Sequence, residues 1–185
     1  SFSFHIDYAS TLDDLILNRS FGTELQTTFL NYWRTSVGFY RSLEYYNDKL
    51  TYDYELNLTG PSVKLPQSDG LFYSIGSDYS KSLFFSFSGT HGNSDIGDWG
   101  NSYSLRIMNR YFENLELSLR LNRNRSYEKY RWLEITQTQE EDGSFTDHYM
   151  FTAAHNRIDV VALRASYGIS RKITVDAYTE YFIYR

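Results

Sequence analysis

Residues 115–122 read Leu-Glu-Leu-Ser-Leu-Arg-Leu-Asn, a strict alternation of aliphatic and polar side chains. Successive side chains of a β-strand point to opposite faces, so this stretch predicts a strand with one apolar and one polar face. The same alternation recurs in nine segments, and none of them has helical spacing. The nine segments are residues 2–8, 25–29, 33–39, 71–75, 83–87, 103–107, 115–121, 161–167 and 175–183. The chain is therefore predicted to be all-β.

Strands of this kind can bury their apolar faces in two ways. The faces can meet inside a soluble sandwich, or they can turn outward to lipid in a transmembrane barrel. The expected connectors alternate in length, with short ones near 30–32, 77–81, 110–114 and 168–172 and long ones near 10–21, 45–68, 91–100 and 127–156. Outer-membrane barrels have short turns at one end and long loops at the other, whereas a Greek-key sandwich scatters them. We therefore expect an antiparallel up-and-down transmembrane β-barrel.

The composition excludes several other classes of protein. The 185 residues contain no cysteine, which removes disulfide scaffolds, thiolate metal sites and cysteine nucleophiles. The net charge of −5 gives no reason to expect nucleic acid as a partner. No apolar run approaches the roughly 18 residues of a membrane-spanning helix. A transmembrane strand needs only about 9–11 alternating residues, so a barrel remains compatible with this composition.

The number of segments bears on the extent of the domain. Nine is odd, whereas single-chain bacterial barrels have an even number of strands. The first and last residues of the chain both fall inside alternating runs. We expect residues 1–185 to be part of a single outer-membrane barrel domain that is truncated at both ends and belongs to a larger barrel.

Six charged side chains are predicted to share the polar, lumen-facing side of successive strands. They are Arg106, Glu116, Arg120, Arg164, Asp176 and Glu180. Side chains that face each other across two strands lie about 4.5–5.5 Å apart, so opposite charges there can pair. This ladder has two interpretations: a charged constriction that selects a solute, or salt bridges that stiffen the wall and fill the lumen. We favour the second interpretation.

Two further groups of residues are candidate sites. Aromatic side chains expected at the membrane interfaces are Tyr32, Trp33, Tyr111, Phe112, Tyr167 and Tyr181. The expected loop 91–100 offers Asn93, Asp95, Asp98 and Trp99 as ligands for calcium or a sugar. Their spacing is not that of an EF-hand, and Gly, Asn and Asp are ordinary turn residues. We predict no metal and no cofactor.

Three stretches of the chain resemble an uncharacterised family of Bacteroidota outer-membrane proteins. They are Leu58-Thr59-Gly60-Pro61 with Leu65-Pro66, then Ser77-Asp78-Tyr79-Ser80-Lys81, and a run from Tyr149-Met150-Phe151 through Leu163-Arg164 and Tyr167-Gly168-Ile169-Ser170 to Tyr178, Tyr181 and Phe182. The chain departs from the family where Leu-Thr-Gly-Pro replaces Arg-Gly-Gly-Pro and where Ser80 replaces an arginine. The resemblance extends from about residue 22 onward. It implies an outer-membrane location, a C-terminal barrel, and a family-9-like carbohydrate-binding module ahead of residue 1. The family has no established activity, so it supplies no catalytic residue.

The expected function is that of a structural or transport-type barrel protein of the bacterial outer membrane, not an enzyme. Its partners would be outer-membrane lipid and, beyond lipid, other envelope proteins or glycan, with a role as a glycan-linked anchor or a subunit of a larger assembly. One alternative is a soluble secreted β-sandwich that binds carbohydrate. A second is a barrel-embedded hydrolase, because the order of Ser and His in a sequence does not reveal triad geometry.

Overall fold

The computed structural model describes residues 1–12, 14–47, 49–51, 60–112, 114–170 and 172–185. These residues form strands and connections only, as the all-β prediction requires. The strands are β1 (Phe2–Ser10), β2 (Ile16–Thr28), β3 (Arg34–Ser42), β4 (Tyr45–Asn47), β5 (Val63–Leu65), β6 (Ser68–Gly76), β7 (Leu83–Ser94), β8 (Trp99–Phe112), β9 (Leu115–Gln139), β10 (Phe145–Ser170) and β11 (Ile173–Tyr184). No helix among the described residues has the length and apolar character needed to cross a membrane.

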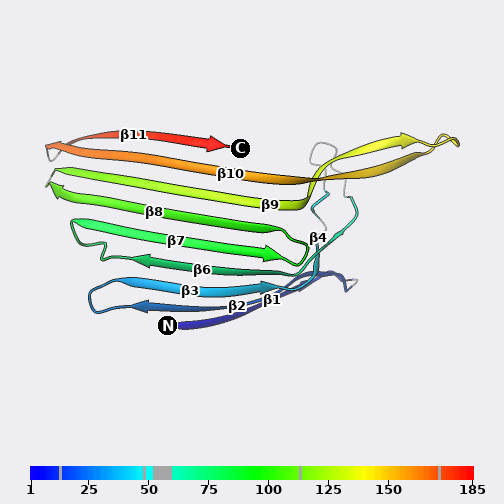
Figure 1. Ribbon diagram of the computed structural model, residues 1–185, viewed down its shortest axis with the longest axis horizontal. Coiled ribbons are helices and arrows are strands. Elements are labelled where there is room, and N and C mark those ends of the chain that lie inside the picture. Colours follow the sequence, from blue (N-terminus) through cyan, green and yellow to red (C-terminus); the bar gives the residue numbers. More distant parts are fainter. Residues whose placement is uncertain (13, 48, 52–59, 113, 171) are drawn as a thin grey trace.

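Nine of these strands form one antiparallel sheet in the order β1-β2-β3-β6-β7-β8-β9-β10-β11 (Figure 1). Each of the nine predicted segments overlaps one of them, and neighbours along the chain are neighbours in the sheet. The up-and-down order is therefore confirmed. β4 and β5 form a separate hairpin inside the connection from β3 to β6. The sheet is open, with β1 and β11 at opposite edges.

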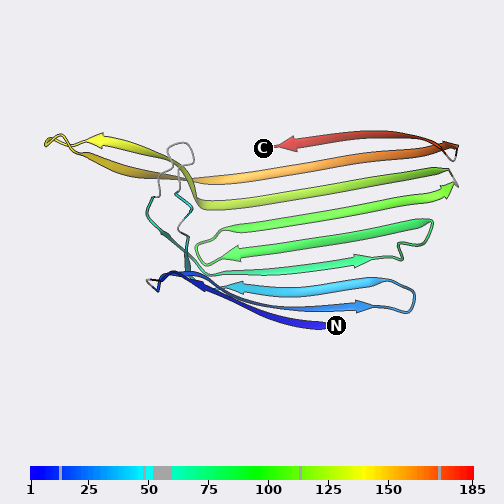
Figure 2. The same ribbon diagram turned by 180° about the vertical axis from the view of Figure 1, so that it is seen from behind.

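The connectors differ from the lengths expected of them. Residues 127–156, expected as a loop, continue β9 and β10 into a hairpin that projects beyond the sheet and turns at 140–144 (Figures 1 and 2). The connection expected at residues 91–100 comprises only residues 95–98, and the connection expected at 10–21 comprises only residues 11–15. Backbone pairing continues past the last apolar position of each strand, because ladder hydrogen bonds do not need apolar side chains. The asymmetry between the two ends thus lies in strand extensions and in the connection from β3 to β6, which remains long and contains β4 and β5.

The register aligns the predicted faces from strand to strand. One rung, a row of directly paired residues, contains Thr27, Thr35, Ile75, Phe87, Leu105, Leu121, Val161 and Tyr181. An adjacent position along each strand gives a rung of Gln26, Ser36, Ser74, Ser88, Ser104, Asn122, Val160 and Phe182. We call the side of the first rung the apolar face and the side of the second the polar face. A slip of one residue would mix the two faces, so this register preserves the separation encoded by the alternation.

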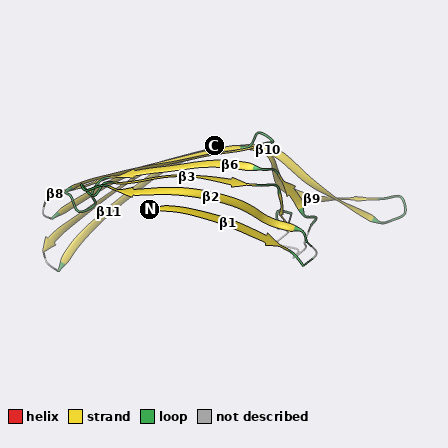
Figure 3. Cartoon of the chain, turned by 90° about the horizontal axis from the view of Figure 1, so that it is seen from below, coloured by secondary structure: helices red, strands yellow, loops and turns green. Residues whose placement is uncertain are grey.

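The sheet is arched, as seen in the view from below (Figure 3). The most enclosed apolar residues, Met108 and Ala162 at 1% and 8% exposure, lie on the polar face. Apolar-face residues are much more open, with Leu25 at 51% and Leu163 at 49%. Side chains inside an arch crowd one another, so we infer that the polar face lines the inside. The second sheet of the described chain, the hairpin of β4 and β5, leaves Leu25 and Leu163 exposed.

Glycines opposite aromatic rings help the arch to form. Tyr40 on β3 pairs directly with Gly70 on β6, and its ring occupies the space that a side chain on Gly70 would need. The same relation joins Phe72 to Gly38. Two further pairs, Tyr73 with Gly89 and His5 with Gly22, repeat it. Aromatic rings laid over cross-strand glycines fix register and allow curvature in sheets.

Candidate functional site

The apolar face carries a continuous belt of aliphatic and aromatic side chains. On β9 the belt comprises Leu115, Leu117, Leu119 and Leu121, and on β10 it comprises Val161, Leu163, Ala165 and Tyr167. These side chains are half-exposed or exposed, with Leu117 at 42% and Tyr167 at 49%. A contiguous exposed apolar surface of this kind marks a site of interaction with protein or membrane.

The upper edge of the belt, at the end away from the short turns, shifts across the sheet in steps, with no shift from β3 to β6 or from β9 to β10. The first charged residue on the apolar face is Arg19 on β2, Arg41 on β3 and Asp69 on β6. On β9 and β10 it is Arg123 and Asp159, which pair directly.

The register gives the size of this shift. The rung of Arg123 and Asp159 continues through Tyr103 and Tyr73 to Leu25 on β2. Leu25 lies six residues from Arg19, and six strand-to-strand steps separate β2 from β10. The belt edge therefore moves by about one residue per strand. With a rise of about 3.3 Å per residue and strands about 4.8 Å apart, it runs oblique to the rungs by about 35°.

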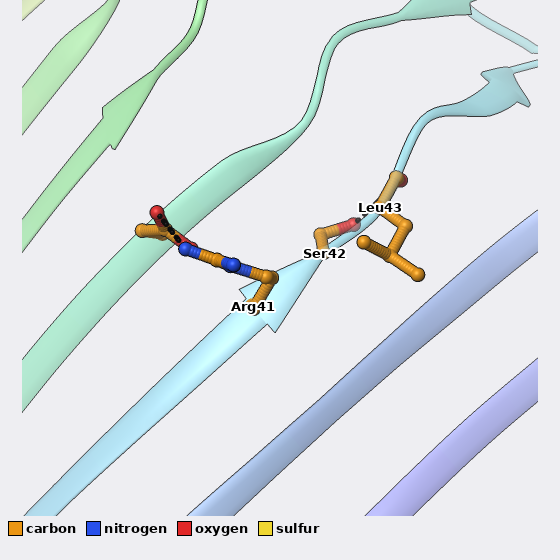
Figure 4. A network of polar contacts seen from close by, with 4 residues as sticks. Arg41, Ser42 and Leu43 are labelled. Carbon is orange, nitrogen blue, oxygen red and sulfur yellow. Dashed lines mark hydrogen bonds and ion pairs between the residues drawn. The ribbon is translucent and has the colours of Figure 1, made fainter.

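Arg41 and Asp69, at the upper edge of the belt, are paired with each other. Arg41 at the end of β3 donates from Nε and Nη2 to the two carboxylate oxygens of Asp69 on β6, at 2.5 and 2.8 Å (Figure 4). The two residues are register partners, so the ladder itself brings the guanidinium to the carboxylate. This bidentate geometry is the strong form of an arginine–carboxylate contact. It lies immediately outside the belt on these two strands.

Small hydroxyl and amide side chains line the polar face on the central strands. Ser36 and Ser74 share a hydrogen bond of 2.8 Å, and the Ser104 hydroxyl donates to Asn122 Oδ1 at 2.7 Å. A hollow of about 650 Å³ lies on this face, lined in part by Ser74, Ser86 and Ser88. Such groups satisfy one another or water, as a hydrated surface requires.

The six residues of the predicted charge ladder all lie on the polar face. Arg106, Arg120 and Glu180 share one rung, with Ala162 between the last two. Arg106 and Arg120 are direct cross-strand partners, which is a destabilising arrangement for like charges. They line a hollow of about 310 Å³ together with Arg164 and Asp176. Within the described part of the chain, neither Arg106 nor Arg120 forms an ion pair.

Two carboxylates of the ladder do have arginine partners. Arg164 Nη2 lies 3.2 Å from Asp176 Oδ1, a pair between two ladder residues. Glu116 instead accepts from Nε of Arg110 at 2.8 Å, and Arg110 was not among the predicted residues. The Arg110 guanidinium also lies 4.5 Å from the centre of the Tyr79 ring and donates to the Tyr79 carbonyl. The sequence signal for Arg110 was the two-residue alternation of β8, which places its side chain on the same face as Glu116.

The predicted interface aromatics are exposed and fall into two groups. Tyr32 and Trp33 lie in the turn between β2 and β3, and Tyr111 and Phe112 end β8. Tyr167 lies near the same end, opposite Leu115. Tyr181 lies toward the other edge of the belt, in the rung of Leu121 and Val161.

Three of the four loop candidates, Asn93, Asp98 and Trp99, line a hollow of about 520 Å³. Asn93 and Trp99 are cross-strand partners at the ends of β7 and β8, not loop residues. Asp98 Oδ1 accepts the backbone N–H of Lys129 at 2.7 Å, which ties the turn to β9. Among the described residues, no three His, Cys, Asp or Glu side chains gather to hold a metal ion.

Comparison with protein-family models, curated proteins and solved structures found no match to this chain. Of the stretches that carry the family resemblance, Leu58 and Thr59 lie outside the described residues. Ser77–Lys81 forms the turn between β6 and β7, in which Asp78 Oδ1 accepts both the backbone N–H and the hydroxyl of Ser80. The Ser80 hydroxyl, and then its N–H, lower the pKa of the Asp78 carboxyl.

Proposed function

We propose that this chain forms part of the wall of a transmembrane β-barrel in a bacterial outer membrane. In this arrangement the apolar belt contacts acyl chains and the polar face lines the lumen. The protein is then a structural or transport-type envelope protein, not an enzyme, with membrane lipid as its first partner. The resemblance of three stretches to Bacteroidota outer-membrane proteins agrees with this proposal.

The oblique edge of the belt is the observation that carries the proposal. A barrel closes only if its strands tilt from the axis by about 35–45° and the register staggers accordingly. A belt that is level in the membrane must then cross the rungs at that same angle. The edge traced by Arg19, Arg41, Asp69 and Asp159 crosses them at about 35°.

The exposed belt also favours a barrel over a soluble sandwich. A sandwich buries its apolar faces between two sheets, but the nine-stranded sheet leaves Leu163 and Leu117 open, and the second described sheet is only the two-stranded hairpin of β4 and β5. Charge is absent from the belt on each strand until its upper edge. Lipid imposes this exclusion, since a charge at the middle of a bilayer costs roughly 2–4 kcal/mol.

Closure of the barrel needs strands beyond these nine. β1 and β11 run in the same direction because eight antiparallel reversals separate them. An antiparallel partner for both edges requires an odd number of additional strands, which gives the even total of single-chain bacterial barrels. Unpaired edges in lipid would cost several kcal/mol per backbone group. We propose that the remainder of the protein supplies these strands.

Residues 1–185 contain no cysteine, so this region offers no competing thiol in a labelling test. Single cysteines at neighbouring positions, Leu105→Cys with Ser104→Cys and Leu119→Cys with Ser118→Cys, are introduced into the full-length protein in lipid vesicles. We expect a charged, water-soluble maleimide to label positions 104 and 118 and to leave 105 and 119 unlabelled. Equal labelling at both members of each pair, or full extraction of the protein without detergent, would overturn the barrel proposal.

A further inference from the structure

An arginine row borders the upper edge of the belt on β9, β10 and β11. Arg125 and Arg157 are direct cross-strand partners on the apolar face. Arg157 and Arg185 exchange backbone hydrogen bonds of 2.8 and 3.0 Å, so the row continues onto the edge of the sheet. Arg123 lies two residues closer to the belt on the same face. Four guanidinium groups therefore gather where the apolar surface ends.

One carboxylate serves this group of arginines. Asp159 accepts from Arg123 Nε at 2.7 Å on one oxygen and from Arg157 Nε at 2.7 Å on the other. Both oxygens are therefore engaged, and the Asp159 side chain is 16% exposed. Within the described part of the chain, Arg125 forms no ion pair, and its side chain is exposed. Like charges placed opposite each other in a sheet destabilise it. The row has more arginines than carboxylates, so it carries a net positive charge that an external anion can neutralise.

A hollow lies directly beneath the row, on the membrane side. Its volume is about 460 Å³, and its walls include Leu105, Leu121 and Val161, with Arg123 and Asp159 at its charged end. Directly above the row, Trp99, Tyr127 and His155 form the next rung on the same face. The Tyr127 and His155 rings lie 4.5 Å apart. From the belt outward, the order is apolar hollow, arginines, then flat rings.

We propose that this surface binds a phosphorylated glycolipid of the surrounding membrane. The proposal rests on the barrel orientation proposed above. An acyl chain occupies the hollow, and a headgroup phosphate lies between Arg125 and Arg157. Guanidinium groups match phosphate oxygens through two parallel hydrogen bonds, and this anion relieves the repulsion between the two arginines. The headgroup sugar then lies against the ring of Trp99 or Tyr127, an apolar surface with a polar edge.

Lipid retention by the full-length protein tests the proposal. Protein purified in detergent is titrated with lipid A, with lipid A stripped of its phosphates, and with phosphatidylglycerol, and bound lipid is counted by native mass spectrometry. We expect wild type to prefer lipid A over both other lipids. The Arg125→Gln/Arg157→Gln variant should bind lipid A about tenfold or more weakly, because charge-assisted hydrogen bonds to phosphate are lost. Arg125→Lys/Arg157→Lys should keep part of the affinity for lipid A, because lysine retains the positive charge but cannot form the two parallel hydrogen bonds of a guanidinium group.

A matched control removes the same charge from the same region. Lys129→Gln/Arg131→Gln deletes two cations of β9 beyond the aromatic rung, and we expect it to bind lipid A as wild type does. Val161→Trp fills the hollow and should also weaken lipid A binding while leaving the arginines in place. Unchanged lipid A affinity in Arg125→Gln/Arg157→Gln, or equal affinity for phosphatidylglycerol, overturns the glycolipid proposal.

A second measurement distinguishes failure of the glycolipid proposal from failure of the barrel proposal. Each variant is also inserted into vesicles and labelled at Ser118→Cys and Leu119→Cys. Failure of the wild-type labelling pattern overturns the membrane orientation itself. A correct pattern combined with unaltered lipid A binding overturns only the headgroup site.

Discussion

Arg106 and Arg120 lie on the polar face and form no ion pair among the described residues. They oppose each other across β8 and β9, and Asp176 beside them already pairs with Arg164. Rings of charged side chains set ion selectivity in pores by favouring the opposite ion. In the proposed lumen these two arginines therefore favour anions.

We expect Arg106→Gln/Arg120→Gln to shift the selectivity of the full-length protein toward cations. Reversal potentials in planar bilayers under a salt gradient measure the shift. Lys129→Gln/Arg131→Gln, which removes equal charge from the projecting hairpin, should leave the reversal potential in place. An identical reversal potential in the Arg106→Gln/Arg120→Gln variant would contradict a role for this pair in selection.

Tyr40 and Gly70 offer a second test at the scale of single residues. A side chain at position 70 would occupy the space of the Tyr40 ring, so Gly70→Val should lower the free energy of unfolding by about 1–3 kcal/mol, as overpacking does. Removing the ring in Tyr40→Ala opens that space. The double variant should then be more stable than the sum of the two single effects predicts, as measured in a double-mutant cycle by urea unfolding in detergent. Strict additivity would contradict the ring-over-glycine account.

The turn between β6 and β7 shows how a short connection is held. Asp78 accepts two hydrogen bonds from Ser80, and Lys81 N donates to the Asp78 carbonyl at 3.2 Å. The two bonds from Ser80 favour the ionised carboxylate, in agreement with its lowered pKa. Asp78 therefore stabilises the folded state above its unfolded pKa of about 3.9 and loses that effect as the pH falls through its folded pKa.

We expect Asp78→Ala to be less stable than wild type at pH 7. The difference should shrink as the pH falls below about 4, because protonation removes the same interactions from wild type. Urea unfolding of both proteins in detergent at pH 7 and at pH 3 measures it. A difference that stays constant over this range would show that the carboxylate charge plays no part in the turn.

The nine strands could be predicted because lipid-type or core-type burial on one face leaves a period of two in the sequence. Residues 115–121 and 161–167 show this period without interruption, and they pair in register. The continuation of β9 and β10 through residues 128–139 and 145–154 could not be predicted. Backbone ladders hold those segments, and their apolar side chains, such as Tyr130, Leu133, Phe145 and Met150, do not keep an uninterrupted period of two.

For the charged residues of the candidate site, the sequence predicted which face of the sheet each side chain lies on, but not which residues pair across neighbouring strands. The two-residue alternation placed Glu116 and Arg164 on the polar face. The distance between them also depends on the register of the paired strands, which cannot be read from a single sequence. As a result, Arg110 was missed as the partner of Glu116. Arg123 and Arg125 extend the alternation of Leu119 and Leu121 on the same face. They were missed because only the apolar positions of that pattern were followed.

At the scale of the whole molecule, the separation of the two faces decides where a charge is tolerated. Phe87 and Ser88 are neighbours on β7 that point to the apolar and polar faces. In a bilayer, Phe87→Arg places a cation against acyl chains at a cost of roughly 2–4 kcal/mol, whereas Ser88→Arg places it in the hydrated lumen. We expect Phe87→Arg to lower the yield of folded full-length protein in vesicles and Ser88→Arg to retain it. Equal yields would place both side chains in water.

The hairpin of β9 and β10 has a practical consequence. Residues 128–139 alone, at about 3.3 Å per residue, extend it by roughly 40 Å. Its tip carries Gly143 at a φ of +84°, with open space around it. In the proposed outer-membrane barrel, with this hairpin on the outer side, an epitope tag inserted at the tip would extend beyond the cell surface and bind antibodies on intact cells.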